Sequence, residues 1–216
     1  MSTCCSTYGG VADRQFDAAR ASQELKQYRK KGPGPTTRLL RDGLGKARVV
    51  HGSLLDIGSG IGALTFGLLD DGSTEAVAVD ASSAYLAVAA AEATRRGHAE
   101  DVRFVHGDFV ELASQIPRAA VVTLDRVVCC YPLVEPLLTA ALEKAERALA
   151  LSYPRDLWYV RAVIGFDNMR RRTARSSFRA FVHSPALMER LIRGAGFRLS
   201  IRRRTWMWSV DTYVRE

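Results

Sequence analysis

Short apolar runs alternate with longer segments of helical composition through most of this chain. We predict strands from Leu54 to Asp56 and at 76–79, Val102–His106, 119–124 and 148–152, and helices at 62–69, 82–96, 133–147, 157–172 and 185–193. Strands that alternate with helices in this way are typical of a parallel, doubly wound α/β sheet.

The end of the chain breaks the alternation. After Gly196, two runs at 197–203 and 205–215 have no helix between them. They predict a β-hairpin whose last strand is antiparallel to the others. The whole pattern therefore predicts a mostly parallel seven-stranded sheet with an antiparallel C-terminal hairpin.

The front of the chain is predicted to be helical. A helix over 16–31 ends at the Gly-Pro-Gly-Pro sequence 32–35, and Thr36 or Thr37 caps a second helix at 38–44. The length fits one sizeable core. We therefore expect residues 1–50 to form a helical extension or lid and residues 51–216 to form one ligand-binding domain.

A glycine-rich turn follows the first predicted strand. Asp56 ends the strand, and Gly58, Ser59, Gly60 and Gly62 lead into the next helix. Glycine adopts positive φ and lets a ligand approach the backbone closely, so this turn predicts a nucleoside cofactor. The turn alone leaves the cofactor open, because its spacing also fits the dinucleotide fingerprint G-x-G-x-x-G/A.

Acidic residues end the next strands as well. Asp80, followed by Ala81, is placed to accept the hydroxyls of a ribose. Gly107-Asp108-Phe109 follows the third strand, where a carboxylate can accept an adenine amino group and a ring can flank the base. The fourth strand ends at Asp125-Arg126, which form either part of the site or only a local ion pair.

This ordered series resembles the class I S-adenosylmethionine-dependent methyltransferases over nearly the whole chain. The resemblance implies a Rossmann-like fold and S-adenosylmethionine as the cofactor. It implies that Asp56 orients the turn and contacts the methionine amino group, and that the glycine turn presents backbone to the methionine and ribose. Asp80 would bind the ribose, Asp108 with Phe109 the adenine, and Asp125 with Arg126 would lie beside the methionine moiety.

Two later segments are similar to the magnesium-protoporphyrin O-methyltransferases. One is Asp125-Arg126-Val127-Val128-Cys129-Cys130-Tyr131-Pro132, and the other is Phe178-Arg179-Ala180-Phe181-Val182-His183. Asp125, Tyr131 and His183 are accordingly our catalytic candidates. His183 is either a general base at the pocket rim or a structural hydrogen-bonding residue.

Two groups of aromatic and basic residues have alternative interpretations. Tyr131, Tyr153 and Trp158 are expected either in the wall of the acceptor pocket or in the core. Tyr28, Lys30 and Lys31 belong either to a lid or to an exposed helix end.

Charge is distributed unevenly along the chain. Residues 151–216 carry 14 arginines and no lysine against 5 acidic residues, a net +9, whereas residues 1–150 carry 17 basic and 18 acidic residues, a net −1. The two densest runs of arginines are Arg170-Arg171-Arg172 and Arg202-Arg203-Arg204. This third is expected to bind an anionic substrate, an acidic membrane surface or nucleic acid, or to be solvated surface.

The cysteines and the lengths of the apolar runs bear on metal binding, cellular compartment and membrane insertion. The adjacent pairs Cys4-Cys5 and Cys129-Cys130 fit neither a zinc site nor a disulfide framework, so we expect free thiols, no metal and a cytoplasmic protein. No apolar run is long enough to span a membrane. The oligomeric state stays open.

The leading hypothesis is methylation of a small-molecule acceptor, which can be anionic, and we do not expect a nucleic-acid partner. The alternatives are an RNA-binding protein or RNA methyltransferase that uses the arginine-rich third, and a nicotinamide oxidoreductase. The sequence D-R-V-V-C-C-Y-P after strand four disfavours the RNA methyltransferase, since it lacks an N-P-P-Y-type motif. The terminal hairpin disfavours the oxidoreductase.

Overall fold

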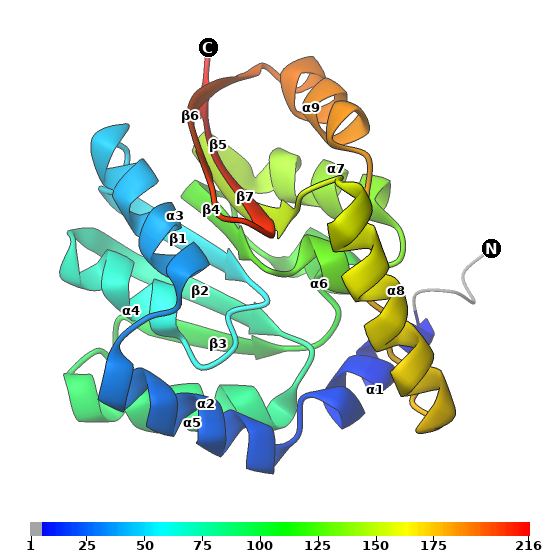
Figure 1. Ribbon diagram of the computed structural model, residues 1–216. Helices are drawn as coiled ribbons and strands as arrows, with labels where there is room; N and C mark the ends of the chain where they lie inside the picture. Colours follow the sequence, from blue (N-terminus) through cyan, green and yellow to red (C-terminus); the bar gives the residue numbers. More distant parts are fainter. Residues whose placement is uncertain (1–5) are drawn as a thin grey trace.

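A computed structural model describes residues 6–216, and its centre is a seven-stranded sheet (Figure 1). The strand order is β3-β2-β1-β4-β5-β7-β6. The strands are β1 (Gly52–Ile57), β2 (Ser73–Asp80), β3 (Val102–His106), β4 (Ala119–Asp125), β5 (Ala145–Pro154), β6 (Phe197–Arg204) and β7 (Trp208–Arg215). Strands β1 to β5 pair in parallel, and β7 pairs antiparallel with both β5 and β6. The predicted fold class is confirmed.

Helices cover both faces of the sheet (Figure 1). The α-helices of the described residues are α1 (Ser6–Gln15), α2 (Ala18–Lys31), α3 (Pro35–Lys46), α4 (Ala63–Asp70), α5 (Ser83–Arg96), α6 (Phe109–Leu112), α7 (Val134–Lys144), α8 (Trp158–Thr173) and α9 (Pro185–Gly194). One apolar cluster joins the sheet to α6, α7 and α9, and a second joins it to α3, α4 and α5. No helix within residues 6–216 is long and apolar enough to cross a bilayer.

The N-terminal segment differs from its prediction in two places. The helix expected over 16–31 begins at Ala18, as α2, because the Asp17 side chain accepts the Arg20 N–H at 2.9 Å and caps it, and a separate helix, α1, precedes it. Thr36 and Thr37 do not cap α3; they lie buried inside it, since Pro35 occupies its first turn. The Cys4-Cys5 pair lies outside the described residues.

Helix α3 packs within the main core. Leu40 and Leu44 are fully buried in the cluster that also holds residues of β1, β2, β4 and β5. Of the segment 1–50, α3 therefore shares its core with the sheet, whereas α2 packs against α5 and α1 lies toward the edge where the strands end (Figure 1).

The boundary after α7 also differs from the prediction. The helix predicted over 133–147 ends at Lys144, and β5 starts at Ala145 rather than at 148. Ala145 is fully buried and lies in register with Ala119 of β4. Pairing with β4 thus overrides the helical composition of these residues.

Candidate active site

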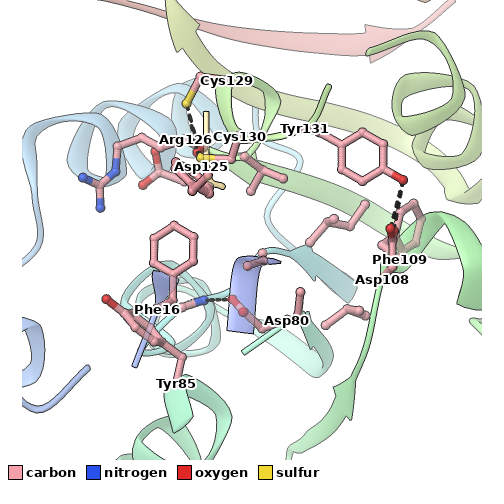
Figure 2. A pocket seen from close by; sticks show the side chains of 18 of the residues that line it. Phe16, Asp80, Tyr85, Asp108, Phe109, Asp125, Arg126, Cys129, Cys130 and Tyr131 are labelled. Atoms are coloured by element: carbon pink, nitrogen blue, oxygen red, sulfur yellow. Dashed lines mark hydrogen bonds between the residues drawn. The ribbon is translucent and has the colours of Figure 1, made fainter. Parts of the chain in front are cut away.

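A cavity lies where the parallel strands end. It has a volume of about 310 Å³ and is lined by residues at the carboxyl ends of β1, β2, β3 and β4 (Figure 2). Nine of the predicted cofactor residues line it, namely Gly58, Gly60, Asp80, Ala81, Gly107, Asp108, Phe109, Asp125 and Arg126. Side chains from distant parts of the chain meet here because parallel strands end at one edge of a sheet.

The turn after β1 has a backbone that requires glycine. Gly58 and Gly60 have φ of 66° and 57°. A Cβ on Gly58 would lie 2.3 Å from Cγ2 of Val127, which leaves no room for a side chain. The Gly58 N–H donates to the Val79 carbonyl at 2.7 Å and so ties the turn to β2.

Three residues predicted for this site do not line the cavity. Gly62 precedes α4, where a Cβ would meet the Phe66 ring. The Ser59 hydroxyl is buried and has no hydrogen-bond partner among the side chains and backbone that the structure describes. Asp56 is buried beneath the turn, and its two oxygens accept hydroxyls from Thr65 at 2.7 Å and Thr123 at 2.6 Å. Burial raises the pKa of Asp56 to about 6.

Asp80 lies at the tip of β2 and faces the cavity (Figure 2). One carboxylate oxygen accepts the Gly60 N–H and the other accepts the Ser82 N–H, each at 2.8 Å. Burial raises the pKa of Asp80, while the two N–H groups oppose that shift. The carboxylate therefore holds the glycine turn and the start of α5 together while it borders the cavity.

Asp108 follows β3, caps α6 and accepts a hydrogen bond from an aromatic hydroxyl. The Tyr131 hydroxyl donates to its two oxygens at 3.2 and 3.0 Å, and the Val110 N–H donates to it at 2.9 Å. Burial raises the pKa of Asp108. Phe109 follows in the buried wall of the cavity.

Asp125 at the end of β4 is held by hydroxyls. Thr37 of α3 and Ser152 of β5 each donate to it at 2.6 Å. Arg126 follows in the left-handed region at φ 60°, and its N–H donates to the Ser152 hydroxyl at 2.8 Å. No ion pair joins Asp125 to Arg126, and no carboxylate in the described part of the chain pairs with the Arg126 guanidinium.

The third catalytic candidate, His183, lies behind the cavity wall. Its Nε2 is 2.9 Å from the Tyr131 carbonyl oxygen. A carbonyl can only accept, so Nε2 carries the proton and donates. Burial lowers the pKa of His183.

Of the three aromatic residues considered for the acceptor wall, one lines the cavity. Tyr131 does so. Tyr153 is buried and donates to Asp211 at 2.7 Å, and Trp158 is exposed on the surface. Cys129 and Cys130 also line the cavity as free thiols, and their Sγ atoms are hydrogen-bonded to each other at 3.6 Å.

Further residues cover the cavity, and all of them except Arg171 and Phe178 were missed by the sequence analysis. Ala12 and Phe16 come from the front of the chain, Arg20 and Glu24 from α2, Tyr85 from α5, and Arg171 and Phe178 from α8 and the segment after it. The ring of Phe16 meets those of Tyr85 and Phe178 edge-on, with centroids 5.7 and 5.5 Å apart. An apolar residue directly before the capping Asp17 was the one local signal for this helix break.

The alternative lid residues lie elsewhere. The Tyr28 hydroxyl accepts from Arg96 of α5 at 2.8 Å, away from the cavity, and Lys30 and Lys31 are exposed. The helix break at Phe16 covers the cavity, whereas the end of α2 does not line it.

Residues 54–151, which span β1 to β5 and hold the strand-end aspartates, match a family described as a methyltransferase domain. They form a methyltransferase domain. The predicted methyltransferase is thereby confirmed for residues 54–151. Among curated proteins, no sequence matches the chain significantly.

Solved methyltransferases share the fold of this methyltransferase. Magnesium protoporphyrin IX methyltransferase from Synechocystis PCC 6803, with bound S-adenosylhomocysteine, is 18% identical with a TM-score of 0.73, and the match covers 97% of this chain and 100% of that one. The same enzyme with bound S-adenosylmethionine is 16% identical with a TM-score of 0.70, and both chains are covered completely.

Other matched structures carry different names. An O-methyltransferase family protein from Burkholderia thailandensis has a TM-score of 0.72 at 13% identity, over 94% of this chain and 62% of that one. A putative RNA methyltransferase from Pyrococcus horikoshii has a TM-score of 0.59 at 15% identity, over 86% and 85%. At these identities the likeness shows the fold, so the acceptor must be argued from the site.

Proposed function

We propose that this methyltransferase transfers a methyl group from S-adenosylmethionine to a small anionic acceptor. S-adenosylmethionine is the methyl donor. The observation that carries the proposal is the convergence of three strand-end aspartates, Asp80, Asp108 and Asp125, on one cavity.

The residues present fit this donor. Gly58 and Gly60 have no Cβ, so the cavity floor stays open to a ligand beside the backbone. Asp80 holds its carboxylate toward the cavity for the ribose hydroxyls, and Ala81 lies beside it. Asp108 and Phe109 border the part of the cavity assigned to the adenine.

When bound, S-adenosylmethionine supplies a sulfonium whose methyl carbon is open to in-line attack. The protein's task is then to align the acceptor and to exclude water. Phe16 and Phe178 close the cavity with apolar rings, and the carboxylate of Asp125, fixed by Thr37 and Ser152, borders the side assigned to the methionine moiety.

Two guanidinium groups support an anionic acceptor. Arg126 lines the cavity without a carboxylate partner among the described residues, and its backbone is fixed by Ser152. Arg171 also lines the cavity and donates to Asp167 at 2.7 Å. A planar guanidinium matches a carboxylate in geometry and charge.

A carboxylate acceptor also agrees with the environment of His183. A hydroxyl or amine must lose a proton to attack, whereas a carboxylate attacks as the anion. The His183 Nε2 proton is donated to the Tyr131 carbonyl, and the ring does not line the cavity. We therefore assign His183 a positioning role that holds the Tyr131 segment. The free thiols of Cys129 and Cys130 are consistent with the cytoplasm as the proposed compartment.

Ligand-dependent thermal stability tests the proposed function. A ligand that binds only the folded protein raises its melting temperature by mass action. We expect S-adenosylhomocysteine to raise it, and NAD and RNA to leave it unchanged. Transfer of a labelled methyl group to a panel of small carboxylic acids, with matching amines and RNA as controls, then identifies the acceptor class. Stabilisation by NAD alone, or labelling of RNA alone, would overturn the proposal.

A further inference from the structure

The outward face of α8 carries large apolar side chains in contact with solvent. Trp158, Phe166 and Met169 are 80%, 66% and 58% exposed. With Ala162 they occupy positions spaced by four, four and three residues, which places them on one side of a helix. We call these four residues the α8 apolar face. Figure 1 shows α8 along the outside of the molecule.

The hairpin turn between β6 and β7 extends this surface. Trp206, which is 64% exposed, stacks on Tyr159 with ring centroids 6.4 Å apart. The Tyr159 hydroxyl donates to the Trp206 carbonyl at 2.8 Å, and the Tyr159 ring meets Trp158 edge-on. The aromatic groups at this end are therefore fixed in place while two of them stay exposed.

The inner face of α8 is occupied by the catalytic domain. Arg171 lines the active-site cavity, and the Asn168 side chain pairs with the Ala180 backbone through two hydrogen bonds of 2.8 and 2.9 Å. Val160 is fully buried. The helix is thus held from its inner side, and the α8 apolar face is the side left to an external partner.

Arginines border the α8 apolar face on both sides. At 3.6 residues per turn, Arg161 and Arg172 fall on one side of it and Arg170 on the other. All three are exposed. Helix α8 contains four arginines and one aspartate, and the whole segment 151–216 has a net charge of +9.

We propose that the α8 apolar face and Trp206 bind the surface of an anionic lipid bilayer. An aromatic stripe flanked on both sides by cations complements the acyl boundary and the charged headgroups of such a surface. Tryptophan favours that boundary because its ring is apolar and its N–H is polar. The inference rests on exposure and charge and is independent of the proposed acceptor.

Vesicle flotation with the full chain tests this proposal. We expect binding to vesicles of phosphatidylcholine mixed with phosphatidylglycerol, roughly tenfold or more weaker binding to phosphatidylcholine alone, and a further loss as salt is raised. A variant combining Trp158→Ser, Phe166→Ser and Met169→Ser should bind anionic vesicles roughly tenfold or more weakly, with an unchanged melting temperature because the three side chains are exposed.

Two further variants separate the contributions. Arg170→Gln with Arg172→Gln should weaken binding and flatten its salt dependence. Leu133→Ser, which alters an exposed apolar residue outside α8, should bind like the wild type. Absence of wild-type binding at low salt, or equal binding by the triple variant, would overturn the proposal. A third outcome would also overturn it: the wild type forms a dimer and does not bind vesicles, and the triple variant is a monomer. The face would then join two copies of the chain.

Discussion

The Tyr131 hydroxyl lies 3.2 and 3.0 Å from the two carboxylate oxygens of Asp108 (Figure 2). Asp108 follows β3, and Tyr131 follows β4, so the contact joins the segments after two strands across the cavity wall. The Tyr131 carbonyl accepts a hydrogen bond from His183 on the other side. One tyrosine therefore links a proposed adenine-binding carboxylate to the segment after α8.

Tyr131→Phe should weaken cofactor binding by disturbing Asp108. The substitution removes one hydrogen bond to a buried carboxylate, a loss of about 0.5–1.5 kcal/mol, which corresponds to about two- to tenfold in Kd. Calorimetry with S-adenosylhomocysteine measures this change. Tyr159→Phe removes a surface hydroxyl and is the matched control, for which Kd should stay constant. Equal Kd values for wild type and Tyr131→Phe would remove Asp108 from the binding set.

Arg126→Gln should raise the KM for the acceptor by about tenfold, since a charge-assisted hydrogen bond to an anion contributes about 1.5–3 kcal/mol. The salt dependence of KM should also become flatter. Arg172→Gln, at an exposed position of α8 outside the cavity, serves as the control. If both variants have the wild-type KM for the identified acceptor, Arg126 does not bind it.

Phe16→Ala should open the cover of the cavity. The variant loses two edge-on ring contacts, each contributing about 0.5–1.5 kcal/mol beyond area burial. We expect the Kd for S-adenosylhomocysteine to rise by about tenfold. Phe166→Ala removes an exposed ring from α8 and should leave Kd unchanged. A wild-type Kd for Phe16→Ala would show that the helix break does not cover the bound cofactor.

His183→Gln and His183→Ala should lower the melting temperature and leave kcat nearly intact. Burial lowers the pKa of folded His183, so the unfolded chain binds the proton more tightly. The stabilising contribution of neutral His183 is therefore present above the unfolded pKa of about 6.5 and is lost as pH falls below it. This loss should be absent in His183→Gln. Normal melting temperatures with a loss in kcat of about 10² or more would instead make His183 a base.

The sequence predicts the strand-end half of the site because chain order determines it. A parallel sheet brings the ends of β1 to β4 to one edge. Asp80, Asp108 and Asp125 therefore come together regardless of the segments that connect the strands. Position along a strand does not determine the direction of every side chain, however. Asp56 was expected at the ligand, yet it points to Thr65 and Thr123 beneath the turn.

The covering half depends on packing between distant segments. Phe16 contacts Tyr85 and Phe178, and no local pattern specifies contacts across such separations. Helical rotation also divides the arginine run. Arg171 faces the cavity, whereas its neighbours Arg170 and Arg172 project elsewhere, because successive residues of a helix point in different directions.

Calorimetric titration of S-adenosylmethionine into wild type, Asp80→Ala and Asp42→Ala tests the central claim most directly. Asp80 is proposed to accept the ribose hydroxyls, and it also holds the Gly60 and Ser82 N–H groups. Loss of such buried polar contacts costs about 1–3 kcal/mol, so the Kd of Asp80→Ala should rise roughly tenfold or more. Asp42→Ala, at an exposed position of α3, should bind like the wild type. A folded Asp80→Ala variant with the wild-type Kd would contradict the assignment of this cavity to the methyl donor.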